Sequence, residues 1–384
     1  MKQNKTRQFS VWMNVGQIYL VGIASFLAYF QVNQMLAVYL DVDQFAQYHL
    51  TLRVTFLLSN ILILGQPLTV RTFLSRALGQ GDEAQAHAVL RWVLLKVRNI
   101  SGIILGLLLV SISVFACVPD VFGGSLLARY PSVFLLINLP IMLLVNLLPA
   151  LLDVFHCFKF SRITQSILSY FIYFVMILLH IRLGFELTNT VLISSFTLSQ
   201  ICVLFIVLIK LKAPLLRIYR APCDVNLLET NQLSDIAKQG FLANVSYQVA
   251  IHFSVLCIGF LSSEENIVAN YSAIMIVVSL FFTLSEFLRG YLSQRMMELR
   301  DQGQLPQARR LLIDVSILNA IGTLIFLAIG WLYADVILKL FGNDFAVNRS
   351  LLQFGLLINA GLNFLAPVWS LIEYAYPHEN AKYC

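Results

Sequence analysis

Residues 188–209 read TNTVLISSFTLSQICVLFIVLI, a run of 22 residues without a single charged side chain. A helix needs about 20 mostly apolar residues to cross the hydrocarbon core of a bilayer, so this stretch predicts a membrane-spanning helix. The rest of the chain has the same character, because 59% of its 384 residues are hydrophobic and only 12% are charged. Ordinary globular chains hold about 25% charged residues. We therefore expect a polytopic membrane protein.

Apolar stretches of spanning length recur along the whole chain. None of them alternates with a period of two, so the sequence predicts an all-α helical bundle rather than a barrel. The ten predicted spans lie near residues 9–31, 45–70, 99–119, 131–152, 164–183, 188–209, 239–262, 267–288, 311–334 and 350–372.

Basic residues lie mainly in alternate connections between these spans. With the N-terminus in the cytoplasm, cytoplasmic segments hold 21 of the 26 Lys and Arg residues, as the positive-inside rule requires. The basic residues form no single patch, so we expect no nucleic-acid partner. The outer loops are too short for a catalytic domain, and we expect no enzyme. The six cysteines and six histidines show no metal-binding spacing, so no metal or other cofactor is expected.

An internal repeat divides the chain. Residues 71–75 read RTFLS and residues 289–293 read RGYLS, an offset of 218. Five further matches occur in the same order with offsets between 217 and 230, among them Asn14 with Asn244 and Asn146 with Asn363. Because six helices separate the two copies, both enter the membrane from the same side, as in parallel repeats of secondary transporters. The sequence predicts an N-lobe of six helices (1–212), a cytoplasmic linker (213–238) and a C-lobe of four helices (239–384).

The repeated segments carry a family resemblance over roughly residues 10–372. A span ends at Pro67 and Arg71 and is followed by a Leu-Ser pair and Gly81, and the second copy has Leu-Ser and Gly303 in the same order. This pattern resembles the polysaccharide exporters of the multidrug/oligosaccharidyl-lipid/polysaccharide superfamily, the Wzx-type flippases, whose architecture is that of multidrug and toxic compound extrusion (MATE) transporters.

The resemblance implies a flippase in the bacterial inner membrane. Such a protein moves an undecaprenyl-pyrophosphate-linked oligosaccharide, an O-antigen or capsule unit, from the inner to the outer leaflet by alternating access. Its partners would be this lipid-linked oligosaccharide, membrane lipids and polysaccharide assembly proteins, with H+ or Na+ as coupling ions. The C-lobe lacks the last two helices of the family pattern, so an inactive truncated exporter is an alternative.

Arg53 is the first candidate for a substrate-binding residue. It lies about eight residues inside its span, and an arginine at that depth is expensive unless it faces protein or a wet cavity. A guanidinium binds pyrophosphate through two parallel hydrogen bonds. The alternative is a packing role, in which helix carbonyls or a neighbouring residue satisfy the side chain.

Two further groups of polar residues belong to the predicted site. Polar residues on one face of the first and seventh spans suit sugar hydroxyls, but they equally suit hydrogen bonds between helices, and a histidine among them could also relay protons. These residues are Asn14, Gln17, Asn244, Gln248 and His252. Basic residues at the inner mouth would attract anionic headgroups, or simply set the topology; they are Arg71, Arg76, Arg289 and Arg295.

Two other functions remain open. A multidrug or cation antiporter of the same fold would need a carboxylate inside the N-lobe, and the predicted spans of that lobe contain none in their interiors. A membrane enzyme acting on the same lipid-linked substrates would need a large outer loop with catalytic residues.

Overall fold

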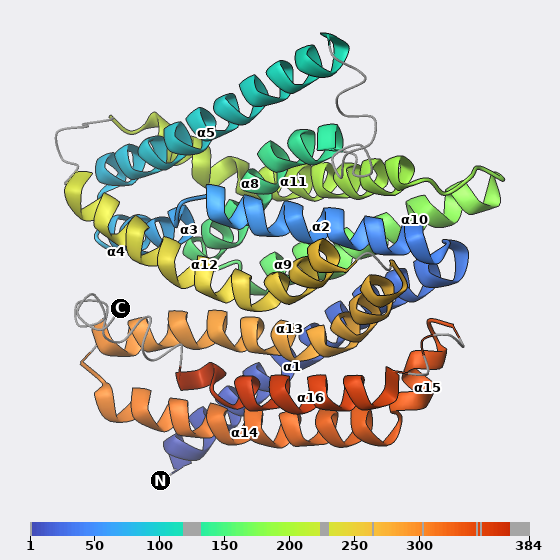
Figure 1. The fold of residues 1–384 in the computed structure, drawn as a ribbon. Helices are drawn as coiled ribbons and strands as arrows, with labels where there is room; N and C mark the ends of the chain where they lie inside the picture. Colours follow the sequence, from blue (N-terminus) through green and yellow to red (C-terminus); the bar gives the residue numbers. More distant parts are fainter. Residues whose placement is uncertain are drawn as a thin grey trace. The chain divides into compact units, whose positions relative to one another are not determined.

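Helices make up every regular element that the computed structural model describes (Figure 1). It describes residues 2–117, 132–222, 230–262, 265–301, 303–342, 345 and 348–368. The first half contains α1 (Lys2–Tyr39), α2 (Val42–Leu62), α3 (Gln66–Thr69), the π-helix η1 (Val70–Leu74), α4 (Ser75–Gly79), α5 (Glu83–Cys117) and α8 (Ser132–Val154). The remainder contains α9 (Phe158–Arg162), the π-helix η2 (Ile163–Leu168), α10 (Ser169–Arg182), α11 (Asn189–Arg220), α12 (Thr230–Leu261), α13 (Glu265–Asp301), α14 (Leu305–Leu332), α15 (Ala334–Lys339) and α16 (Arg349–Phe364).

The described helices confirm a multi-pass membrane protein. Six are long and apolar enough to cross a membrane, and two bent helix pairs raise the number to eight. The ten predicted spans fall on helices over most of their described residues, but the span 45–70 crosses a break at residues 63–65. The predicted spans 99–119 and 131–152 are not among these eight. Residues 118–119, 131 and 369–372 of the predicted spans lie outside the described residues.

Two compact units divide the chain at places that differ from the predicted lobe boundaries. One unit contains residues 1–39 and 270–384, and the other contains residues 40–269. In the predicted repeat, α1 and α12 are the first helices of the two copies. Each unit therefore contains the first helix of the opposite copy, and the physical reason is the set of side-chain contacts described below for α1 and α12.

The predicted linker 213–238 is largely helical. α11 continues through Pro214 to Arg220, and α12 already begins at Thr230. Leu211 and Ile218 are buried in the apolar core of the 40–269 unit, with Leu215 packed against it. This packing on both sides of Pro214 holds the segment in a helix despite the backbone hydrogen bond that proline removes.

Within the 40–269 unit, α2 lies against α8, α11 and α12. The buried apolar core combines η1, α5, α8 and α11 through residues such as Leu74, Val93, Leu143 and Val203. Polar pairs add to it: the Tyr173 hydroxyl donates to the Tyr48 hydroxyl at 2.7 Å, linking α10 to α2. The unit is therefore a single bundle arranged around α2.

The end of α2 is a sharp break that brings the backbone against α12. Leu64 and Gly65 have φ angles of 50° and 70°, in the left-handed region, and the chain bends by 49° between α2 and the 66–79 segment. A Cβ on Gly65 would lie 2.0 Å from the Ala237 carbonyl oxygen, and one on Gly240 would lie 2.8 Å from the Leu68 Cβ. Only glycine permits this approach.

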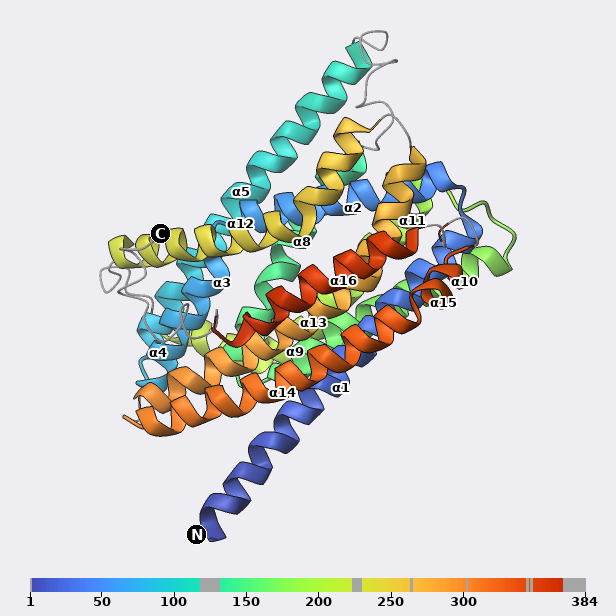
Figure 2. The ribbon, with the colours of Figure 1, turned by 60° about the horizontal axis from the view of Figure 1, so that its bottom comes forward.

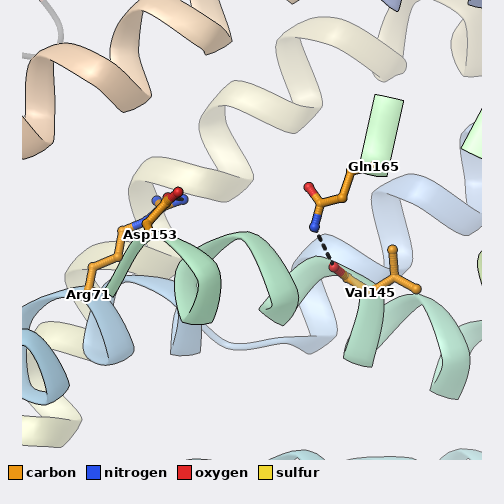
Figure 3. Close-up of polar contacts among 4 residues, drawn as sticks. All are labelled: Arg71, Val145, Asp153 and Gln165. Carbon is orange, nitrogen blue, oxygen red and sulfur yellow. Dashed lines mark hydrogen bonds and ion pairs between the residues drawn. The ribbon is translucent and has the colours of Figure 1, made fainter. Parts of the chain in front are cut away.

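A second proline, Pro149, lies inside α8 and frees one carbonyl group. Because proline has no N–H, the Val145 carbonyl four residues earlier loses its usual helical donor. Gln165, on the π-helix η2, donates its side-chain Nε2 to this oxygen at 3.5 Å, as Figure 3 shows. A side chain from a neighbouring element thus replaces the missing backbone donor.

In the other unit, a buried polar network joins four helices. Asn319 on α14 donates Nδ2 to the Asn363 carbonyl at 2.6 Å and accepts from the Tyr19 hydroxyl of α1 at 2.9 Å. The Asn363 side chain of α16 donates to the Thr323 hydroxyl at 2.7 Å and accepts from the Ser285 hydroxyl of α13. α14 and α16 lie side by side in both ribbon views (Figures 1 and 2).

The same asparagine–serine pair occurs in both units. Asn146 on α8 donates to the Ser59 hydroxyl on α2 at 3.1 Å, and Asn363 on α16 accepts from Ser285 on α13. The offset between the asparagines is 217 and that between the serines is 226, within the range of the sequence repeat. The pairs join corresponding helices of the two predicted copies.

We expect Gly65→Ala to destabilise the protein more than Gly81→Ala. Both residues have a positive φ, but a Cβ on Gly81 meets nothing within 4 Å. Gly81→Ala should therefore carry only the left-handed backbone strain, about 1–2 kcal/mol. Gly65→Ala should lower the free energy of unfolding by roughly a further 1–3 kcal/mol, because the added Cβ overlaps α12. Thermal unfolding in detergent measures both, and equal losses would contradict the close approach.

We expect Asn363→Ala to lower the free energy of unfolding by about 1–3 kcal/mol, because it leaves buried polar partners unsatisfied. Asn359→Ala, one turn earlier on the same helix, is the matched control. Among the described residues, its side chain bonds only to the Gly355 carbonyl of its own helix, so the change in the free energy of unfolding should stay near zero. SDS unfolding in mixed micelles compares the two, and a similar loss for both would contradict the network.

Candidate functional site

Arg53 lies in the middle of α2, where it faces α12. Its side chain is 7% exposed. The neighbouring hydroxyls of Thr51 and Thr55 donate to carbonyls of α2 itself. Arg53 Nη1 instead donates to His252 Nδ1 of α12 at 3.2 Å.

This hydrogen bond fixes the state of His252. A guanidinium carries donors only, so Nδ1 of His252 must be the acceptor and cannot carry a proton in this arrangement. The imidazole that bonds to Arg53 is therefore the neutral form with its proton on Nε2. Its ring also stacks on Phe56 of α2, with 6.0 Å between centroids and 13° between planes.

In the part of the chain that the structure describes, Arg53 has no nearby counter-charge. Among the described residues, no carboxylate forms an ion pair with it, and its Nη2 is buried without a hydrogen-bond partner. His49, one turn earlier on the same face, is 2% exposed and its Nε2 is also buried without a partner. A buried charge normally has a paired and fully hydrogen-bonded environment. Arg53 Nη2 can therefore still donate to a ligand, and so can His49 Nε2 in the tautomer that carries its proton there.

Aromatic rings surround this polar group. Phe56 packs edge to face on Phe196 of α11 at 5.9 Å, and Phe196 packs likewise on Tyr173 of α10 at 5.6 Å. On the other side, Phe45 contacts His49 edge to face at 4.4 Å. The low polarity of these rings strengthens any electrostatic contact made by Arg53.

α2 and α12 are antiparallel, so residues early in α2 contact residues late in α12. Leu50 contacts the position of Gly259, and a Cβ there would lie 2.3 Å from Leu50 Cδ2. Asn244 donates Nδ2 to both the carbonyl and the side-chain oxygen of Asn60, at 3.2 and 3.3 Å. Asn244 thus joins helices in this structure, and its role as a substrate ligand stays a prediction.

The other residues of the predicted polar stripe are dispersed between the two units. Gln248 is half-buried on α12 and makes no hydrogen bond to the described residues. Gln17 is exposed on α1 in the unit of residues 1–39 and 270–384, and the side chain of Asn14 lies outside the described ones. The structure brings together Arg53, His252 and Asn244 on one helix pair.

The inner-mouth arginines differ in their surroundings. Arg71 on η1 forms an ion pair with Asp153 at the end of α8, with Nη2–Oδ2 at 3.1 Å and Nε–Oδ2 at 3.2 Å (Figure 3). Arg76 is exposed, Arg295 is half-buried, and the side chain of Arg289 lies outside the described ones. Arg71 therefore has a carboxylate partner, while attraction of headgroups by any of the four remains a prediction.

Sequence reasoning missed His49 and the Arg71–Asp153 pair. His49 was detectable, because it lies four residues before Arg53 and so on the same helix face. Asp153 was not, because 82 residues separate it from Arg71.

A shallow hollow of about 460 Å³ lies between the ends of α5 and α11. Arg217 and Arg220 line it, but Arg217 is bonded to Glu83, with Nε–Oε1 at 2.6 Å. The carboxylate offsets one of the two charges, so this hollow is a weaker anion site than the buried nitrogens of α2.

Comparisons with known proteins identify the fold. No protein-family profile and no curated protein matches the sequence. Among solved structures, an inward-facing multidrug resistance MATE transporter of the MOP superfamily (the superfamily of the predicted exporters) is 15% identical with a TM-score of 0.63, covering 93% of this chain and 87% of its own. An outward-facing one is 14% identical with a TM-score of 0.66, covering 95% and 85%.

A third similar structure has a different binding pocket. A MOP superfamily transporter from Pyrococcus furiosus, described as having a pocket of reverse polarity that suggests a different function, is 14% identical with a TM-score of 0.68, covering 94% of this chain and 84% of its own. These likenesses confirm the predicted MATE-like fold.

We expect a double-mutant cycle to show coupling between Arg53 and His252. Arg53→Met and His252→Leu should each destabilise the protein, and the double variant should lose less than their sum, by about 1.5–3 kcal/mol for a hydrogen bond to a charged group. SDS unfolding in mixed micelles measures the four free energies. Arg53→Met combined with Lys238→Gln, an exposed change elsewhere on α12, is the control and should be additive. Additivity in the main cycle would contradict the bond.

Proposed function

We propose that the protein is an alternating-access exporter that moves an anionic lipid-linked oligosaccharide across the membrane, in the manner of a flippase. The observation that carries the proposal is the buried cation Arg53, which has no carboxylate partner among the described residues. We further propose that it works in the bacterial inner membrane with its N-terminus in the cytoplasm, alongside polysaccharide assembly proteins.

The fold supports the transport mechanism. Structures described as inward-facing and as outward-facing MATE transporters both resemble this chain over more than nine-tenths of its length. A fold that occurs in both conformations suits a carrier that exposes one site alternately to the two sides. Coupling to H+ or Na+ would supply the driving force.

The charges around Arg53 favour an anionic headgroup. A pyrophosphate offers several acceptor oxygens, which match the unpartnered Nη2 of Arg53 and Nε2 of His49. In the described helices of this unit, the carboxylates lie near the helix ends, at Asp43, Glu83, Asp153 and Asp235. The helix interiors thus present positive charge and no negative charge to a substrate.

The competing function is export of cationic drugs. It is favoured by the two similar transporters that are described as multidrug resistance proteins. The Pyrococcus furiosus transporter, with its pocket of reverse polarity, supports the view that the electrostatic character of the site varies within this fold. The identity of the cargo therefore depends on the site residues rather than on the fold.

Lipid-linked oligosaccharides provide the test. A strain with the gene disrupted should accumulate them on the inner leaflet, and the intact gene should reverse the accumulation. We expect Arg53→Gln, at normal expression, to leave the accumulation unreversed. Arg53→Lys should restore only part of the export activity, because lysine keeps the charge but loses the paired donors. Extraction and quantification of the lipid-linked sugars, with membrane expression checked by immunoblot, measures each variant.

Lys212→Gln on α11 is the matched control, because it removes an exposed positive charge away from Arg53, and it should restore export fully. Export restored equally by Arg53→Gln would remove Arg53 from the mechanism. An absence of accumulation in the disrupted strain, together with increased sensitivity to cationic drugs, would establish the competing function.

A further inference from the structure

The two halves of α12 are held to α2 and α3 by different interactions. Near its start, α12 meets the α2–α3 break through close backbone contacts at Gly65 and Gly240, which no side chain separates. Farther along, at His252, the polar contact with α2 is the hydrogen bond from Arg53. The contact near the start of α12 does not depend on charge. The second half combines the charge-dependent bond at His252 with an apolar contact, that of Leu50 with Gly259.

A bend separates these two halves. The axis of α12 turns by 54° between Thr230–Ser246 and Ile251–Leu261. His252 lies at the start of the second half, directly after the bend. Loss of its bond to Arg53 would therefore act on the Ile251–Leu261 half, while the glycine contacts keep the first half in place.

The bond is incompatible with a proton on His252 Nδ1. Nδ1 can accept from Arg53 Nη1 only through its lone pair, and protonation would place two positive charges 3.2 Å apart in a buried site. Histidine is the side chain that ordinarily changes charge between about pH 5 and 8. Proton binding and the docked arrangement therefore exclude one another.

The other titratable groups near this contact do not replace His252. On α2 they are His49 and Arg53, and Tyr48 of α2 is hydrogen-bonded to Tyr173 of α10. On α12 itself Cys257 is half-buried. Among the described residues, α3, α8 and α11 bring no charged group to Arg53 or His252. His252 is thus the titratable group bonded to the buried cation.

We propose that His252 is a proton-binding residue that controls the availability of Arg53. In its neutral form His252 accepts the hydrogen bond from Arg53 Nη1 and holds the Ile251–Leu261 half of α12 against α2. When it binds a proton, this half moves away, and Arg53 together with the imidazolium forms a dication for an anionic headgroup. The identity of that headgroup rests on the proposed function, whereas the proton-dependent movement does not.

Linkage then makes the two binding events mutually favourable. If a proton on His252 raises the affinity for an anion, the anion must raise the affinity for the proton by the same factor. Anion binding at this site should therefore be stronger at low pH and should be accompanied by proton uptake.

The movement can be measured without any cargo. Nitroxide labels at Leu183→Cys, just after α10, and Leu261→Cys, at the end of α12, report the distance between the two by double electron–electron resonance. Both residues are exposed, at 61% and 86%, and belong to the same unit. The background replaces the six native cysteines, and the full chain is studied in lipid nanodiscs.

We expect one distance population at pH 8 and a second one that grows as the pH falls to 5. In His252→Gln the second population should be absent at every pH, because glutamine can accept from Arg53 but cannot titrate. In His49→Gln the pH response should persist. Geranylgeranyl pyrophosphate, a short lipid pyrophosphate, should increase the second population of the unmodified site at pH 7.

An unchanged distance between pH 8 and 5, or an equal response in His252→Gln, would overturn the proposal, and loss of the response in His49→Gln would transfer it to the other histidine. These results are independent of the export assay. A pH response without any effect on lipid-linked oligosaccharides would disprove the proposed cargo alone. Export that requires Arg53 without a pH response would disprove the role of His252 alone.

Discussion

The contact between α2 and α12 is the constraint on which the 40–269 unit depends. At one end, Gly65 and Gly240 let two backbones approach so closely that a single methyl group on Gly65 would overlap a carbonyl oxygen. In the middle, Arg53 donates to His252, its one hydrogen-bond partner among the described residues. Because the predicted repeat assigns α12 to the second copy, this contact also places it in a unit with helices of the predicted N-lobe.

The two units differ in how their buried polar groups are satisfied. Buried polar groups in an apolar bundle must satisfy one another, since lipid offers no hydrogen bonds. The unit of α1 and α13–α16 does so with neutral amides and hydroxyls centred on Asn319 and Asn363. The unit of α2–α12 instead holds the buried charge of Arg53, and Nη2 of Arg53 and Nε2 of His49 are among its buried atoms without a hydrogen-bond partner. Ser272 and Gln304 of the other unit also leave buried oxygens without a partner, so it is the buried charge of Arg53 that favours a functional role.

The proposed export function would gain from such an incomplete site. A buried cation that is only partly satisfied binds an anionic headgroup without first breaking an ion pair, and a neutral histidine can hold it until a ligand or a proton arrives. The break after α2 and the bend in α12 both lie on the side of this site toward the start of α12. Rigid backbone contacts beside a bend allow one half of a helix to move while the other half stays packed.

The sequence by itself determined the fold class and the helices, because stretches of about 20 apolar residues have only the helical solution in lipid. It also identified Arg53, since a charge deep in a span is conspicuous. The partners of Arg53 and Arg71 came only from the tertiary structure, because 199 and 82 residues separate the bonded side chains. The grouping of α1 and α12 came from the same source. Sequence position follows chain order, whereas packing follows shape and charge, and here the two assign the first helix of each repeat to different units.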